Sequence, residues 1–178
     1  MKSWIRAGLQ WVAALICLSL APAASAEEVN FDSGWLFAKG DLAGAETVAG
    51  AEADWQKVDL PHDWAITGTF DRNALSTGSG GWLPTGVVWY RKRFTLPAAD
   101  RGKRVSVEFG GIMERGGVWI NGHHVGHRPN GYSTVRYDIT DHLKWDGPNV
   151  IAVRADTSRQ PASRWYAGGG IYRSVRLI

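Results

Sequence analysis

Short runs of alternating apolar and polar side chains restrict the fold of this 178-residue chain more than any other feature. In residues 104–109, for example, Val105, Val107 and Phe109 alternate with polar neighbours, as in a strand with one buried face. No long stretch shows the period of a helix. The pattern predicts an all-β fold, a jelly-roll β-sandwich, because many short strands separated by Gly, Pro and Asn pack best in two layers. The other predicted strands cover residues 88–96, 134–139, 151–155 and 175–177.

Three local signals refine this prediction. Asn121-Gly122 stands between Val118-Trp119-Ile120 and His123-His124-Val125 and predicts a type I′ hairpin turn, because both central residues of such a turn need positive φ. Residues 138–143 are predicted to form one short helical turn, with Thr140 or Asp141 as its cap. Residues 66–86 are rich in Thr, Gly, Asn and Ser, and a loop this long in a compact domain is usually functional or disordered.

The first 26 residues have the features of a secretory signal peptide. Lys2 and Arg6 precede an apolar run, and Ala24-Ser25-Ala26 forms a small-residue cleavage site. Cleavage there would leave residues 27–178, a length that suits one domain with a real core. The only cysteine, Cys17, lies inside the leader, so no disulfide framework is expected. We therefore expect an exported protein, located in a bacterial periplasm or outside the cell.

The charge of the mature chain is nearly balanced. Loss of Lys2 and Arg6 leaves 18 basic residues against 17 acidic ones, and the formal charge falls from +3 to +1. No basic stripe is present, which argues against a nucleic-acid partner. After the leader, no stretch is long and apolar enough to predict a membrane span.

The carboxylates show no pair of the kind that glycoside hydrolysis requires, and Glu108 occupies a solvent-facing position of its predicted strand. Asp63 is the exception because it follows a strand and precedes the long loop; a sugar contact and an Asx-turn are equally compatible with it. His123, His124 and His127 straddle a hairpin without spaced acidic or cysteine partners, so we expect solvated histidines and no metal. No phosphate-binding loop or nucleophile elbow is present, and no cofactor is expected.

Aromatic residues in loop-like segments are the remaining candidates for ligand binding. The stretch Ser163–Arg173 places Arg164, Trp165 and Tyr166 before three glycines. Aromatic faces beside a guanidinium suit sugar recognition, because rings cover the apolar face of a sugar and charged donors bind its hydroxyls. A turn with a solvated arginine and two core aromatics is the alternative reading. Three loop tryptophans are the candidates for sugar platforms: Trp64, Trp82 and Trp165.

Several stretches together resemble the N-terminal sugar-binding domain of glycoside hydrolase family 2, which includes β-galactosidases, β-glucuronidases and β-mannosidases. The resemblance covers nearly all of residues 29–178, and the order and spacing of its pieces are specific. The β-galactosidase-like branch is the most similar, from His62-Asp63-Trp64 and Ser163-Arg164-Trp165-Tyr166. The matching pieces are residues 55–64 (WQKVDLPHDW), 86–96 (GVVWYRKRFTL), 118–126 (VWINGHHVG), 131–133, 137–140, 149–156 (NVIAVRAD) and 163–173.

This resemblance implies a galactose-binding-like jelly roll beside an immunoglobulin-like domain and a (β/α)₈ barrel that carries both catalytic glutamates of a retaining mechanism. Carried over by position, Asp63 and Arg164 would reach the terminal sugar, while Trp165 and Tyr166 would shape its pocket. Some relatives bind a cation near the position of Arg164, which an arginine cannot do. Residues 27–178 contain no barrel, so we expect no hydrolysis by this chain alone.

Three functions of different classes follow. The chain is a non-catalytic domain of an exported β-glycosidase, with β-linked galactosides or uronides as ligands and the downstream domains as partners. Alternatively, it is a free-standing carbohydrate-binding module. The third alternative is an assembly domain without a ligand of its own.

Overall fold

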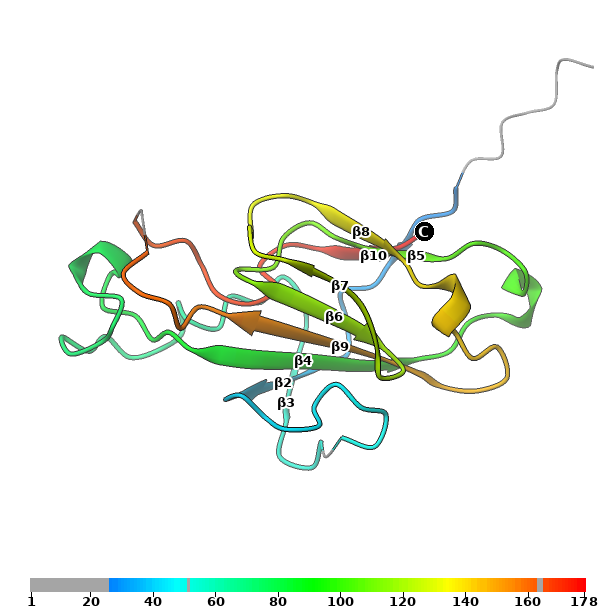
Figure 1. Cartoon of the computed structure of the whole chain (residues 1–178), viewed down its shortest axis with the longest axis horizontal. Coiled ribbons are helices and arrows are strands. Elements are labelled where there is room, and N and C mark those ends of the chain that lie inside the picture. The colour runs from blue at the N-terminus through cyan, green and yellow to red at the C-terminus, as the bar shows by residue number, and fades with distance from the viewer. Residues whose placement is uncertain (1–25, 51, 163–164) are drawn as a thin grey trace, which may run out of the picture.

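The computed structural model describes residues 26–50, 52–162 and 165–178. In this part of the chain, ten strands form two antiparallel sheets with the orders β1-β10-β5-β8 and β3-β2-β4-β9-β6-β7 (Figure 1). The described residues contain no α-helix, only three short 3₁₀ turns. The all-β prediction is therefore confirmed. The strands are β1 (Val29–Asn30), β2 (Trp35–Lys39), β3 (Gln56–Val58), β4 (Val87–Phe94), β5 (Ser106–Phe109), β6 (Gly116–Ile120), β7 (His123–Arg128), β8 (Val135–Asp138), β9 (Asn149–Asp156) and β10 (Val175–Leu177).

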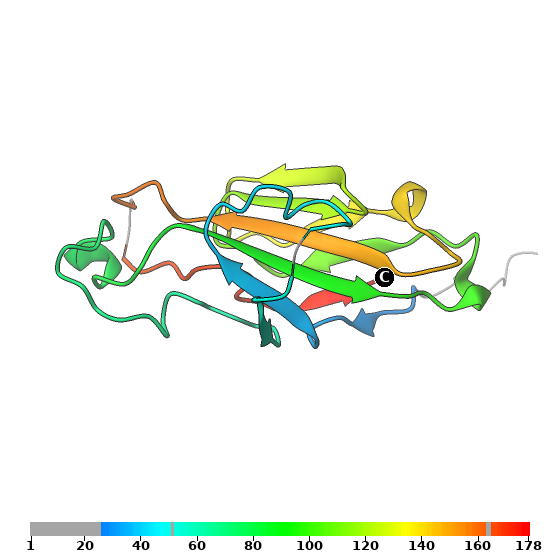
Figure 2. The ribbon, with the colours of Figure 1, turned by 90° about the horizontal axis from the view of Figure 1, so that it is seen from below.

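The core lies between the two sheets and follows the alternation of the sequence. Strands β4 and β9 pair over eight residues each, from Val87 opposite Asp156 to Phe94 opposite Asn149. Figure 2 shows these two long strands, green and orange, beside the blue β2. Every second side chain of these strands points inward and packs against the inward side chains of the smaller sheet, which forms the core of the sandwich. The fully buried inner residues include Val88, Tyr90, Val107, Phe109, Val118, Ile120, Ile151, Val153 and Val175.

The predicted hairpin forms between β6 and β7. Asn121 and Gly122 both have positive φ, 50° and 85°, as a type I′ turn requires. The predicted helical turn is also present, as a 3₁₀ turn at Thr140–His142, but its predicted cap is wrong. The carboxylate of Asp138 accepts hydrogen bonds from the Thr140 backbone N–H at 3.0 Å and from its hydroxyl at 2.6 Å.

The outer faces of the sheets carry charged side chains that the sequence pattern would leave in solvent. Glu108 on β5 is only 8% exposed, contrary to its predicted solvent-facing position. Arg136 and Arg176 donate to its two carboxylate oxygens, each at 2.7 Å, and their side chains cover it. These hydrogen bonds, first those of Arg136, hold the pKa of Glu108 below its usual range. Glu108 is therefore buried, although the alternation of the sequence places it on the solvent side of its strand.

A second outer-face arginine anchors the irregular segment 40–55. Arg91 on β4 is 0% exposed, and its Nε donates to Glu52 at 2.7 Å. The same guanidinium donates to the carbonyl oxygens of Ala45 and Thr47. Since a buried guanidinium needs acceptors on several sides, this segment is held against the six-stranded sheet. Its Ala45 packs against Trp89 on β4 and Ala152 on β9, and its residues 41–44 and Glu46 border a hollow that Trp119 and Arg154 also line.

Candidate functional site

Two loops that are far apart in the sequence run together at one end of the sandwich. The backbone N–H of His62 donates to the carbonyl of Ile171 at 2.8 Å, and that of Trp64 donates to Gly169 at 3.2 Å. The chain between β3 and β4 and the chain between β9 and β10 both extend from this end (Figure 1). The sequence-predicted residues of both segments therefore belong to one loop cluster, called here the rim.

Asp63 joins the two loops through both of its carboxylate oxygens. Oδ1 accepts hydrogen bonds from the backbone N–H of Ala65 at 3.1 Å and of Gly169 at 3.0 Å. Oδ2 accepts from the hydroxyl of Tyr166 at 2.7 Å. The contact with Ala65 is the Asx-type turn that the sequence suggested. The two partners from the other loop, 103 and 106 residues away, lie beyond the reach of sequence reasoning.

A buried tyrosine lies beneath this connection. The hydroxyl of Tyr90 donates to the carbonyl of His62 at 3.1 Å and lies 2.9 Å from the Nδ1 of the same residue. Burial raises the pKa of Tyr90 well above its usual range and lowers the pKa of His62 below 6.5. Gly170 passes so close that a Cβ there would lie 2.1 Å from the Tyr90 hydroxyl oxygen, and its φ is +88°. Only glycine suits this position.

The predicted aromatic platforms divide into exposed and buried ones. Trp165 is 70% exposed and Trp82 is 44% exposed, both on rim loops. Trp64 is only 4% exposed, within the core cluster, so its prediction as a sugar platform is wrong. The Lys39 ammonium lies 5.3 Å from the centre of the Trp64 ring and helps to cover it. Trp64 lies on a loop next to the sheet, but its ring packs in the core because burial of its large apolar area is favourable.

Tyr166 lies half-buried beside Trp165. Burial, together with the Asp63 carboxylate that accepts a hydrogen bond from its hydroxyl, raises the pKa of Tyr166 far above its usual value. The hydroxyl is therefore a neutral donor at any physiological pH. Arg164, the fourth predicted contact, lies outside the described residues. A narrow hollow of about 50 Å³ opens at the rim, lined by Ser76, Leu83, Glu114, Gln160, Trp165, Tyr166 and further small residues of the same loops.

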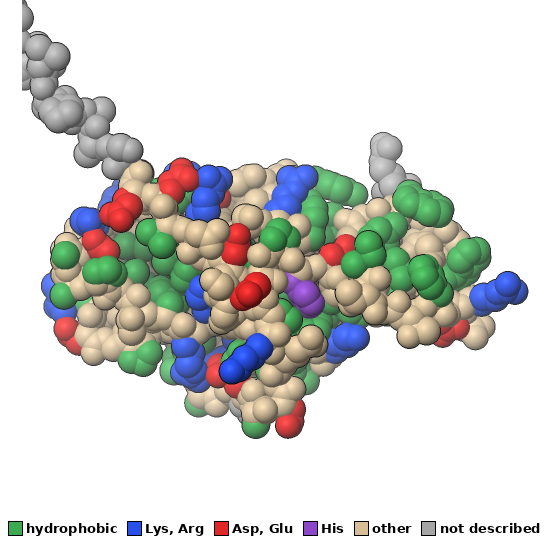
Figure 3. Space-filling model, turned by 180° about the vertical axis from the view of Figure 1, so that it is seen from behind, with side chains coloured by type: hydrophobic (Ala, Val, Ile, Leu, Met, Phe, Trp, Pro, Cys, Tyr) green, Lys and Arg blue, Asp and Glu red, His purple; other side chains and the backbone are tan. Residues whose placement is uncertain are grey.

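Exposed apolar side chains gather around these loops. The space-filling view in Figure 3 shows apolar side chains close together at the loop end of the molecule. Such clustering at one end is typical of a surface that contacts a ligand or another protein segment. The strongly exposed members are Ile66, Phe70, Leu75, Trp82 and Trp165.

An ion-pair network next to the rim was missed by sequence reasoning. Arg115 donates to Glu114 at 2.6 Å and to Asp156 at 3.2 Å. Arg154 bonds the other oxygen of Asp156 at 3.3 Å and both oxygens of Asp41, at 2.9 and 2.8 Å. Burial opposes ionisation of Asp156, but hydrogen bonds from Ser158 and Arg115 outweigh it and hold its pKa well below 3.8. No short sequence motif predicts this network, because its members come from three segments that are far apart in the chain.

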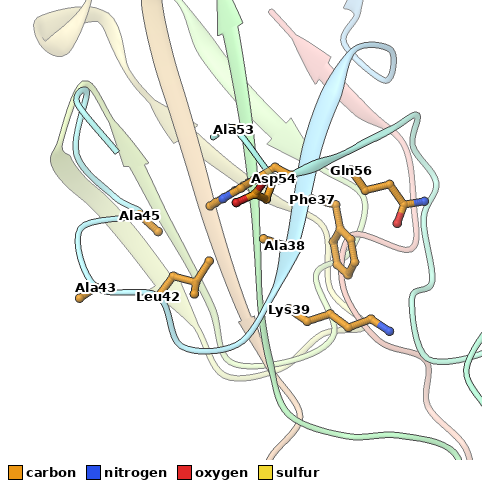
Figure 4. A pocket seen from close by; sticks show the side chains of 10 residues that line it. Phe37, Ala38, Lys39, Leu42, Ala43, Ala45, Ala53, Asp54 and Gln56 are labelled. Atoms are coloured by element: carbon orange, nitrogen blue, oxygen red, sulfur yellow. The ribbon is translucent and has the colours of Figure 1, made fainter. Parts of the chain in front are cut away.

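Two other features carry no site of their own. A hollow of about 600 Å³ between β2 and the segment 40–56 is lined mainly by small apolar side chains. In Figure 4 its labelled polar groups, Lys39, Asp54 and Gln56, come from different sides and do not converge. His123 stacks on His142 with ring centres 4.8 Å apart. Among the described residues, no group of three or more His, Cys, Asp or Glu is placed to hold a metal ion.

Comparison with known proteins identifies the domain. Residues 57–168 match the family described as glycosyl hydrolase 2 galactose-binding domain-like. The chain belongs to this family. Its predicted resemblance to the N-terminal domain of glycoside hydrolase family 2, and with it the galactose-binding-like β-sandwich, is therefore confirmed.

Similar proteins are β-galactosidases and β-glucuronidases. The chain is 48% identical over 161 residues to the β-galactosidase BoGH2A of Bacteroides ovatus, covering 90% of this chain and 19% of that protein. A β-glucuronidase of Formosa agariphila is 34% identical, with 83% and 16% covered. The crystal structure of a β-glycosidase from Bacteroides vulgatus superposes with a TM-score of 0.83 at 42% identity, covering 86% of this chain and 20% of that chain. The chain thus spans about a fifth of the length of such relatives.

Proposed function

We propose that this chain is the non-catalytic sugar-binding domain of an exported retaining β-glycosidase that acts on β-galactosides or β-glucuronides. The relatives support this proposal through the enzymes that they name and through their fivefold greater length. The catalytic glutamates would belong to a barrel domain in the same polypeptide, beside an immunoglobulin-like domain. The rim would then form part of the wall of the sugar pocket. Residues 1–26 would direct export to the periplasm or the exterior.

The observation that carries this proposal is the 2.7 Å hydrogen bond between Tyr166 and Asp63. It brings the two predicted sugar-binding segments together and leaves Trp165 exposed next to them. A carboxylate oxygen has two lone pairs, so Oδ2 of Asp63 can accept one more hydrogen bond, from a sugar hydroxyl. The Tyr166 oxygen can accept another from a second sugar hydroxyl, because its O–H donates to Asp63 and its lone pairs remain free.

The remaining predicted residues would complete the contact from the loop side. Trp165 and Trp82 present ring faces that can cover the apolar face of a sugar, and Arg164 would donate to its hydroxyls. The rim hollow is too small to bury a whole monosaccharide by itself. We therefore expect the isolated chain to bind galactose or glucuronate weakly and to hydrolyse neither.

A chimeric enzyme tests the proposal. Residues 27–178 replace the matching domain of the Bacteroides ovatus β-galactosidase, and kcat and KM are measured on an aryl β-galactoside. Asp63→Ala and Trp165→Ala should each lower kcat/KM by about tenfold or more, as loss of a charged hydrogen bond or a buried ring does. Asp146→Asn, an exposed aspartate paired with Arg101, is the matched control. The proposal would be overturned by a soluble, active chimera whose kcat/KM is unchanged by both rim variants.

The same variants separate the alternatives. A free-standing module would bind galactose or galactan with the isolated chain at sub-millimolar affinity, measured by calorimetry. An assembly domain would bind no sugar, and its chimera would lose stability, not catalysis, when the rim is changed. Reading the codons that follow Ile178 tests directly whether a barrel is encoded in frame.

A further inference from the structure

The outer face of the six-stranded sheet carries a second set of aromatic and charged side chains. We call this surface the outer shelf; it comprises Asp41, Trp89, Trp119, His124 and Arg154. Two hollows, of about 500 and 330 Å³, meet there and share Trp119 and Arg154 in their linings. Unlike the rim residues, all shelf residues except Asp41 stand on paired strands.

The strand register explains why the ring of Trp119 lies flat. Trp119 is opposite Ala152 on β9 and His124 on β7, while Gly117 is opposite Arg154. The indole leans over Gly117, where a Cβ would lie 2.6 Å from its Cη2 atom. The glycine and the alanine thus provide the space in which a large ring can lie along the sheet. Trp119 is partly exposed and lines both hollows, so a pyranose ring could stack on the accessible part of its indole.

Aromatic side chains flank this flat ring on both sides. The ring centre of Trp89 is 5.2 Å from that of Trp119 at 41°, and the ring of His124 is 5.0 Å away at 53°. Both neighbours are tilted. Trp89 is only 3% exposed and supports Trp119 from within a buried cluster with Ala45 and Ala152, while the exposed His124 ring forms one side of the shelf. A shape of this kind limits where a ligand can lie.

Paired charges supply hydrogen-bonding groups beside the ring. Arg154 binds Asp41 with two hydrogen bonds at 2.9 and 2.8 Å and also bonds Asp156. A side-by-side carboxylate and guanidinium can accept from and donate to neighbouring sugar hydroxyls. Together with Arg115 and Glu114, the network has three acidic and two basic groups and a formal charge of −1. This charge favours a neutral ligand over an anionic one.

One buried donor on this surface, the Nε of Arg115, has no hydrogen-bond partner among the described residues. Arg115 lines the smaller of the two hollows. The indole N–H of Trp89 faces the Asp41 carboxylate and, after the hydrogen bonds from Arg154, helps to lower the pKa of that group. Because buried donors are normally satisfied, a hydroxyl-bearing ligand or a bridging water would complete the Arg115 donor.

We propose that the outer shelf is a binding site for a neutral β-linked glycan, with one sugar stacked on Trp119 and its hydroxyls bound by Arg154, Asp41 and Asp156. The shelf adjoins the rim, since Glu114 lines the rim hollow and bonds Arg115, which lines the shelf. The shelf can hold a glycan whether or not the rim contacts sugar, because no residue of the outer shelf lines the rim hollow.

A titration of the purified chain tests this site. Indole N–H signals in ¹⁵N–¹H NMR spectra are followed while β-1,4-galactotriose is added up to 10 mM, with tri-galacturonate as the anionic comparison. We expect the Trp119 and Trp89 signals to move and saturate with the neutral sugar, and to move at least tenfold less with the anionic one. An absence of shifts at both tryptophans, or equal binding of tri-galacturonate, would overturn the proposal.

Variants separate the shelf from the rim. Trp119→Ala should weaken galactotriose binding at least tenfold, and Asp41→Asn, at an exposed side chain, should weaken it severalfold without disturbing the core. Tyr132→Ala removes an exposed aromatic elsewhere and is the matched control. If Trp165→Ala abolishes binding and Trp119→Ala does not, the sugar binds the rim: the shelf proposal then fails while the proposed function gains support. Self-association that buries Trp119 in sedimentation and NMR experiments would also refute the shelf as a glycan site.

Discussion

The rim and the outer shelf both present tryptophans, but they position them in different ways. At the rim, Trp165 and Trp82 stand on loops whose approach depends on a few contacts around Asp63 and Gly170. On the shelf, Trp119 and Trp89 stand on paired strands, and the register sets their spacing. Loop contacts can change without unfolding the sandwich, whereas the shelf can change only with its sheet. The comparison suggests an adaptable surface beside a rigid one.

The largest effect on stability is expected from a substitution of Gly170 at the rim. Gly170→Ala would place a Cβ against Tyr90 at a positive φ, so it should lower the free energy of unfolding by about 3 kcal/mol. Urea denaturation of the purified chain measures this change. Gly147→Ala is the control, because nothing lies within 4 Å of its Cβ position, and its effect should stay within about 0.5 kcal/mol. Equal effects of the two variants would show that the rim backbone is not constrained by Tyr90.

The next effect should be confined to the rim. Asp63→Ala removes the acceptor of the Ala65 and Gly169 N–H groups and of the Tyr166 hydroxyl. The substitution should lower the free energy of unfolding by about 2 kcal/mol and abolish hydrogen-exchange protection of the Gly169 amide. Asp63→Asn retains Oδ1 as an acceptor and should preserve part of that protection. Unchanged exchange at Gly169 in both variants would contradict the role of Asp63 as the connection between the loops.

A smaller cost is expected on the shelf. Gly117→Ala would push the Trp119 ring away from the sheet, but the ring edge can rotate, so the cost should be about 1 kcal/mol. The change should appear as a shifted Trp119 indole signal with β6 and β9 amides unaltered. Loss of the whole β6 signal set would mean that the ring and the sheet are not separable.

The smallest effect is a dependence on pH. The pKa of Asp156 is held below 3.8 in the folded chain, so the unfolded chain binds more protons in acid. The stability that Asp156 contributes is complete above about pH 4 and is lost as the pH falls through that range toward its folded pKa. Asp156→Asn should therefore flatten the fall in stability between pH 5 and pH 3 by less than about 1 kcal/mol. Urea denaturation at both pH values, beside the exposed-site variant Asp54→Asn, measures it; an unchanged slope would contradict the role of the Arg115 and Ser158 contacts.

Much of the architecture could be predicted from local patterns. The strands followed from alternation, and the β6–β7 turn followed from Asn121-Gly122, because both depend on residues close together in the chain. The candidate rim residues followed from a family resemblance that is now confirmed. The cap of the 3₁₀ turn was assigned to the wrong residue, since Thr, Asp and Ser near a turn have nearly equal local propensities.

Burial was less predictable than the strands. Trp64 was expected on the surface and is in the core, and Glu108 was expected in solvent and lies under two arginines. The ion-pair network from Asp41 to Glu114 was not anticipated at all. In each case the deciding partner comes from a distant segment, so no motif or period records it.

Composition and residue order were enough to establish an all-β sandwich, its main strands and the loops from which ligand contacts could come. They were enough because turn preference and face alternation act between near neighbours. Which side chains meet across 40 or 100 residues, as Arg91 meets Glu52 and Asp63 meets Tyr166, became clear only in the folded chain. These long-range contacts depend on how the two sheets and their loops pack, because close packing and the need to pair buried polar groups act on all of these segments at once.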